Sequence, residues 1–199
     1  MAIRVYPMDV ASTPGSFTRL TKPGSTASSM ELISTQILSG SVASIVFSLS
    51  SSQQTTYKYL QLRIAARTTT AAISEDIWVR FNSDATTANY TYHGLYGTGT
   101  AAGGENSFSW AGARIAQASG ASDTANVFLP SIVDILDPFS TTKNKSLKAL
   151  NGSASSQLRV FMASNLWLST AAVSSITLLG GSGGSFVLGS RFSLYGVRA

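Results

Sequence analysis

Apolar and polar residues alternate with a period of two along most of the chain after residue 30. Leu60, Leu62 and Ile64, for example, are separated by single polar residues. Because successive side chains of a β-strand point to opposite faces, this pattern predicts half-buried strands. No window of helical length shows an apolar stripe at helical spacing. Further alternating positions are Ile45, Phe47 and Leu49; Ile77, Val79 and Phe81; Val127 and Leu129; Leu158, Val160 and Met162, between which lie Arg159 and Phe161; Ile176 and Leu178; and Phe192 and Leu194.

Segments rich in Gly, Ser, Thr and Asn separate the predicted strands and indicate turns or loops. They cover residues 50–56, 94–106, 119–124, 140–145, 151–156 and 180–185. Roughly eight to ten strands joined by such loops are typical of an antiparallel sandwich or jelly roll. We therefore predict an all-β fold, an antiparallel β-sandwich that is jelly-roll-like, as a single domain over residues 31–199.

Residues 1–30 differ from the rest of the chain. Three prolines within them suppress helix formation and pairing inside a sheet. Val5, Tyr6 and Met8 are apolar and would be exposed without purpose if this segment only preceded the domain. We predict an extended N-terminal arm that anchors on a neighbouring subunit; a frayed leader is the alternative.

Composition narrows the classes of protein that fit. The 199 residues are 44% hydrophobic, enough for one domain with a core, but only 12% charged. A surface built from hydroxyl and amide groups suits a protein that works inside an assembly. The net charge of +5 comes from scattered basic residues rather than a patch, which argues against nucleic-acid binding.

Cysteine is absent, which excludes disulfides and thiolate metal sites. The N-terminus lacks the apolar core of a secretory signal, and no stretch approaches the ~20 apolar residues of a membrane span. We therefore expect no membrane insertion.

Few residues suggest chemistry. His93 is the only histidine, and no spacing supplies it with a nucleophile and an orienting acid. The motifs G-x-S-x-G and H-E-x-x-H do not occur. Asp134 and Asp137 fit a polar strand face and a turn better than a pair of glycosidase carboxylates. Asn82 and Asp84 offer too few oxygens for Ca²⁺ and fit a turn-stabilising motif. We expect no catalytic residue, no cofactor and no metal.

Aromatic side chains gather around the Gly-rich segment 94–106. Rings that carry hydroxyl groups near a flat polar surface suit carbohydrate stacking or a protein interface. Ordinary core and edge packing is the alternative for each of them. The predicted exposed binding surface consists of Trp78, Tyr90, Tyr92, Tyr96, Phe108 and Trp110.

Several motifs resemble a family of structural modules from tailed bacteriophages. The most specific are YKYLQLR, RFNSD followed by NYTYH, and the terminal RFSLYG. Such modules occur in tail-fibre and tail-tip proteins and as short stand-alone virion proteins, including those of cyanophages. The resemblance covers about residues 32–198 and leaves residues 1–30 outside. It implies that the C-terminal strand closes the sandwich, and it supplies no catalytic residues.

The resemblance implies a surface-displayed structural protein of a phage virion, part of the tail fibre or tail tip and involved in attachment. The alternatives are a capsid decoration (cement) protein on the phage head, a carbohydrate-binding module and, with less support, a glycan-degrading enzyme. The expected partners are other virion proteins, with a host-surface glycan as a further candidate. We also expect a homo-oligomer, a trimer in the first instance, because low-charge β-modules cover strand edges and apolar patches by assembly.

Overall fold

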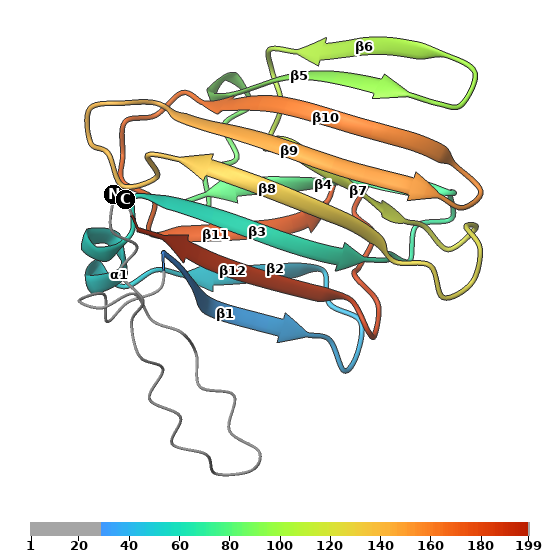
Figure 1. The fold of residues 1–199 in the computed structure, drawn as a ribbon, viewed down its shortest axis with the longest axis horizontal. Coiled ribbons are helices and arrows are strands. Elements are labelled where there is room, and N and C mark those ends of the chain that lie inside the picture. Colours follow the sequence, from blue (N-terminus) through green and yellow to red (C-terminus); the bar gives the residue numbers. More distant parts are fainter. Residues whose placement is uncertain (1–28, 199) are drawn as a thin grey trace, which may run out of the picture.

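A computed structural model describes residues 29–198, which form two antiparallel β-sheets packed face to face (Figure 1). The prediction of an all-β sandwich is confirmed. The predicted arm, with Val5, Tyr6 and Met8, lies outside the described residues. Within residues 29–198, no helix is long and apolar enough to cross a membrane.

The described chain contains twelve strands, one short α-helix and one 3₁₀ turn (residues 87–89). The larger sheet has the strand order β1-β12-β3-β8-β9-β10-β5-β6, and the smaller one has the order β2-β11-β4-β7. The elements are β1 (Met30–Ile37), β2 (Ser44–Ser48), α1 (Ser51–Thr56), β3 (Tyr59–Ala66), β4 (Ser74–Phe81), β5 (Tyr90–Gly97), β6 (Ala102–Ser107), β7 (Ala113–Ser119), β8 (Leu129–Leu136), β9 (Lys145–Ala154), β10 (Leu158–Trp167), β11 (Ser175–Gly180) and β12 (Arg191–Val197).

Eight of these strands pair in a nested order: the first of the eight pairs with the last, the second with the seventh, and so on inward. In the larger sheet β1 pairs with β12 and β3 with β8; in the smaller sheet β2 pairs with β11 and β4 with β7. The hairpin β5–β6 is inserted between β4 and β7, and the hairpin β9–β10 between β8 and β11. Both hairpins extend the larger sheet beyond β8, so that its outer side becomes one broad face (Figure 1).

The core lies between the two sheets and follows the alternation of the sequence. Leu60, Leu62 and Ile64 of β3 are buried there, as are Val79 and Phe81 of β4. Burial of apolar surface at about 25 cal/mol per Å² is the main force that holds the sheets together. The predicted closing strand is β12, whose Phe192 and Leu194 are also buried.

Residues 50–56 form a helix rather than the predicted loop. The Ser50 hydroxyl accepts a hydrogen bond from the Gln53 amide at 3.3 Å, and the Gln53 side chain accepts one from the Ser50 amide at 2.8 Å. These reciprocal bonds form a capping box, which stabilises a helix start through local contacts. The helix buries no side chain, so it has no apolar stripe by which the sequence could reveal it.

The Gly-rich segment 94–106 forms most of the hairpin β5–β6 rather than a loop. A Cβ at Gly94 would lie 2.5 Å from the Phe161 ring, and one at Gly103 would lie 2.6 Å from the Tyr96 hydroxyl oxygen. The glycines therefore make room for rings that pack on the strands. They also interrupt the alternation by which strands are recognised. Likewise β9 continues through Ala154, into the segment 151–156 that was predicted as a loop.

Candidate functional site

The predicted aromatic surface is only partly exposed. Phe108 is 76% exposed, whereas Tyr90 and Tyr92 are buried, so the prediction of exposure is wrong for these two. The Tyr90 hydroxyl accepts a hydrogen bond from the Phe81 amide at 3.0 Å and donates one to the Asp84 carbonyl at 3.1 Å. Burial raises the pKa of Tyr90 well above its usual value. Its ring and hydroxyl therefore serve the core.

Trp78, Trp110 and Tyr92 come together in a packed cluster rather than a flat platform. The ring centroids of Trp78 and Trp110 are 4.9 Å apart, and those of Tyr92 and Trp110 are 5.5 Å apart. The rings are tilted against one another, and both tryptophans are half-buried. Half-buried Tyr96 lies apart from this cluster, beneath the Arg159 guanidinium at 4.3 Å. Edge packing, the alternative considered for these residues, accounts for this arrangement.

A partly buried ionic network adjoins the aromatic cluster. The guanidinium of Arg114 contacts Asp76 at 2.8 Å, Glu105 at 2.9 Å and the Tyr92 hydroxyl at 2.7 Å. Arg159 makes a second ion pair with Glu105. Burial alone would raise the pKa of Glu105, but the hydrogen bond and charge of Arg114 outweigh it and hold this pKa below its usual value.

The ionic network joins β6 and β10 of the larger sheet to β4 and β7 of the smaller one. No local pattern predicts this network, because its charges lie up to 83 positions apart, from Asp76 to Arg159. Each carboxylate already has a cationic partner, and no nucleophile stands among these groups. The arrangement is suited to holding the inserted hairpins in place rather than to chemistry.

The remaining acidic residues stabilise turns and strands. Asp134 accepts a hydrogen bond from the Gln61 side chain at 2.9 Å, and Asp137 forms an ion pair with Lys143 at 2.8 Å. Asp84 accepts hydrogen bonds within its own turn, as its predicted turn-stabilising role requires. Across the described residues, no three His, Cys, Asp or Glu side chains come together in a way that could hold a metal ion.

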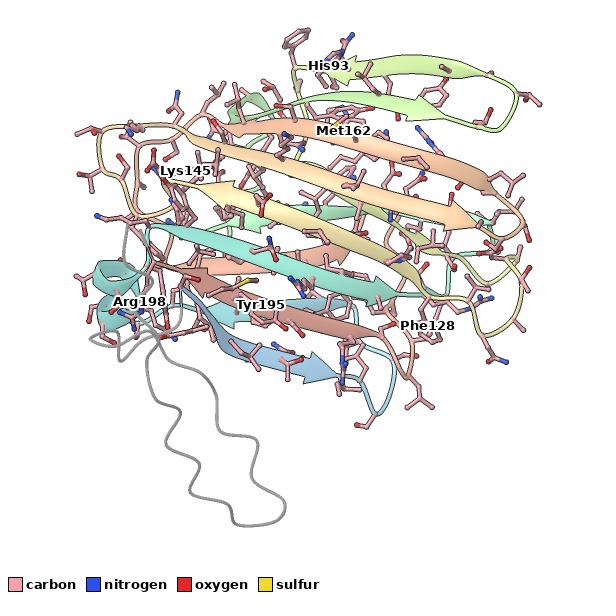
Figure 2. The ribbon with its side chains drawn as sticks, viewed as in Figure 1. His93, Phe128, Lys145, Met162, Tyr195 and Arg198 are labelled. Atoms are coloured by element: carbon pink, nitrogen blue, oxygen red, sulfur yellow. The ribbon has the colours of Figure 1, made fainter. Side chains whose placement is uncertain are left out.

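The most unusual surface is the outer face of the larger sheet, where large apolar side chains stand exposed on four adjacent strands. On β10 the alternation is as predicted, but Phe161 and Ala163 are buried in the core while Val160 and Met162 are exposed on the outer side. Met162 is labelled in Figure 2. Eight such side chains, between 38% and 59% exposed, define what we call the open face: Leu95 of β5, Ile132 and Leu136 of β8, Leu150 of β9, and Leu158, Val160, Met162 and Leu166 of β10.

Strand register aligns part of the open face into a ladder. Ile132 is paired with Leu150, Leu150 with Met162, and Met162 with Leu95, so one row crosses β8, β9, β10 and β5. The next row along the strands is polar. It consists of Asp134, Lys148, Ser164 and His93 in the same strand order.

Beside the ladder, the open face is hollowed. A groove of about 490 Å³ lies over Pro130, Ile132, Leu150, Gly152 and Val160, and a second hollow of about 500 Å³ shares three of these residues. Nothing lies within 4 Å of the position that a Cβ at Gly152 would take, so this glycine leaves open space in the floor of the groove. Apolar lining and the absence of a side chain at this point make the groove a place where a partner's apolar side chain fits.

No protein-family model, no curated protein and no solved structure matches this chain. Of the predicted surface, Phe108 alone is mostly exposed, and it lines a small hollow at the rim of the open face together with His93, which is labelled in Figure 2. The open face itself was not predicted. A local sign of it is that both faces of the segment 158–162 hold an apolar residue, Val160 on one and Phe161 on the other.

Proposed function

We propose that this chain is a non-enzymatic structural protein of a tailed-phage virion, displayed on the particle surface as a tail-fibre or tail-tip component that takes part in attachment. The observation that carries the proposal is the open face. Its eight apolar side chains expose on the order of 800 Å², at about 200 Å² for each fully exposed large residue. Six of them, all but Leu136 and Leu166, lie on one side of the polar row and expose on the order of 600 Å², which is at the upper end for the largest apolar patch of a soluble monomer. Such a face suits a protein that works within an assembly.

The strand order supports the proposal. The nested pairs β1/β12, β3/β8, β2/β11 and β4/β7 follow the order of a jelly roll, a fold common in viral capsid and lectin domains. The resemblance of YKYLQLR, RFNSD and RFSLYG to phage modules points the same way. Because a fold alone does not imply a function, the proposal depends on the open face rather than on the strand order.

The state of the polar residues supports a non-enzymatic role. The carboxylates of Glu75, Asp84 and Asp123 each accept several hydrogen bonds that close turns, and Glu105 is held by two arginines. A general acid or base needs a carboxylate that is free to exchange protons with a substrate. The acidic groups of this domain are used for structure instead.

A capsid decoration protein on the phage head is the second candidate. The breadth of the larger sheet favours it, because an eight-stranded sheet with a four-stranded apolar face can lie flat against a lattice of capsid subunits. A carbohydrate-binding module is the further alternative, favoured by exposed Phe108 beside a hollow of about 230 Å³ that His93 and Asn106 also line. Glycan-array binding that disappears in Phe108→Ala would support that alternative.

Gold-labelled antibodies raised against the purified chain test the proposal on particles of the phage that encodes it. We expect label at the tail, and antibodies pre-absorbed with the purified chain serve as the control. Label spread over the head would replace the tail assignment by the decoration protein. Particles that carry no label and contain no copy of the chain by mass spectrometry would refute the virion proposal.

A further inference from the structure

The two central strands of the open face have complementary shapes. On β10 the exposed positions hold large side chains, and on β9 the positions paired with them hold small ones. Val160 is paired with Gly152, Leu158 with Ala154, and Leu166 with Ser146. The result is a ridge of apolar side chains on β10 that runs beside a furrow on β9, and Gly152 leaves the floor of the furrow empty.

We propose that two copies of this chain associate face to face through the open face, around a twofold axis that runs between β9 and β10 parallel to the strands. Such an axis exchanges the two strands, so β10 of one copy lies over β9 of the other. Each β10 residue of one copy then faces a β9 residue of the other copy. This is the same β9 position with which it is paired in its own sheet, so Val160, for example, faces Gly152 of the second copy. The ridge of each copy enters the furrow of the other.

Val160 makes the sharpest fit. It is 59% exposed and would enter the open space above Gly152 of the second copy. The apolar ladder closes around the axis at the same time, with Leu150 over Met162 of the second copy and Ile132 over its Leu95. Aligned sheets pack about 10 Å apart with their strands within about 30°, which suits two twisted sheets that meet along their central strands.

The polar row does not oppose this contact. The same axis places Asp134 opposite His93 of the second copy, and Lys148 opposite its Ser164. No pair of like charges is brought directly opposite. The two copies of Lys148 flank the axis, but each is paired with Asp134 of its own sheet, whose opposite charge offsets their repulsion.

The size of the open face favours a second copy as the occupant. Each copy contributes on the order of 800 Å², which is what one partner buries in a standard stable interface. A twofold interface requires a surface that is complementary to itself, and the pairing of large with small residues across β9 and β10 supplies this. The open face shows no comparable pattern of complementary residues for the expected trimer. The inference goes beyond the proposed function and does not depend on the virion assignment.

Sedimentation of the full-length chain between about 1 and 100 μM tests the proposal. We expect a dimer, twice the 20.8 kDa of the chain. Leu150→Glu places a charge beside the axis and should weaken association at least 100-fold. Val46→Glu is the matched control, since Val46 is exposed to a similar extent on β2 of the other sheet, and it should leave the dimer intact. Circular dichroism melting confirms that both variants fold.

Gly152→Trp provides a second variant. The position has open space above it, so the fold tolerates the ring while the furrow is filled, and the dimer should dissociate. The cysteine-free sequence also allows direct mapping. A chain carrying Leu150→Cys, mixed with one carrying Met162→Cys, should cross-link through a bismaleimide spacer of about 10 Å, the distance between packed sheets.

Three results would overturn the proposal. A monomer throughout the concentration range would show that the open face does not bind its own copy. A trimer would show a different symmetry. A dimer that survives both Leu150→Glu and Gly152→Trp would place the interface elsewhere, for example along the edge strand β6.

Discussion

The carboxylate of Asp84 joins the end of β4 to the end of β10. It accepts hydrogen bonds from the Trp167 indole at 2.7 Å, the Asn89 side chain at 2.8 Å and the Thr86 amide at 2.9 Å. Burial alone would raise the pKa of this carboxyl. The hydrogen bonds, that of Trp167 foremost, outweigh burial and lower the pKa from 3.8 to about 2.

This lowered pKa makes Asp84 a source of stability above acidic pH. The folded state holds its proton less tightly than the unfolded state, so the contribution is fully present above the unfolded value of 3.8. It is lost as the pH falls from there through the folded value of about 2. The difference between the unfolded and folded pKa values of Asp84 corresponds to about 2 kcal/mol in the free energy of unfolding at pH 7. Asp84→Asn removes the charge, keeps the shape and leaves one acceptor for three donors.

Urea unfolding of wild type and Asp84→Asn at pH 7 and near pH 2.5 measures the effect. We expect the variant to be less stable by about 2 kcal/mol at pH 7, and the gap to shrink below about 1 kcal/mol in acid. Asp137→Asn is the control, because its ion pair with Lys143 is exposed and is expected to contribute less than about 1 kcal/mol. A gap between wild type and Asp84→Asn that stays constant across this range would refute the electrostatic argument.

Three further predictions concern buried polar groups. Tyr90→Phe leaves the Phe81 amide without its acceptor, and urea unfolding should show a loss of about 1–3 kcal/mol. Asn151→Ala removes a side-chain amide that donates to the carbonyls of Gln117 and Pro130, so hydrogen exchange in β7 and β8 should accelerate along with a loss of about 2 kcal/mol; unchanged protection would contradict this. Burial lowers the pKa of Lys145, so wild-type stability should rise as the pH climbs toward 10.5, and Lys145→Met should lack that rise in urea titrations.

Local patterns in the sequence determined the all-β class and most of the core. In β3 and β4 the predicted apolar faces are the buried ones, because each strand lies in a sheet with one covered side and the alternation records that side directly. Likewise the turn role of Asp84 can be predicted from the sequence, because two of its hydrogen-bond partners, Thr86 and Asn89, lie within five positions of it. The alternation and the turn depend only on residues that are close together in the sequence, so both can be predicted from it.

Tertiary structure decided the parts that depend on distant partners. A period of two shows that β10 has two faces but does not say which is covered. The smaller sheet settles that, because Arg114 of β7 lies over the Phe161 ring at 4.8 Å. The hydroxyl of Tyr92 can be buried because Arg114, 22 positions away, donates a hydrogen bond to it. The open face arises only when β8, β9, β10 and β5, far apart in sequence, align their outward residues in one register. The size and shape of the open face are therefore properties of the whole sheet and cannot be predicted from any one strand.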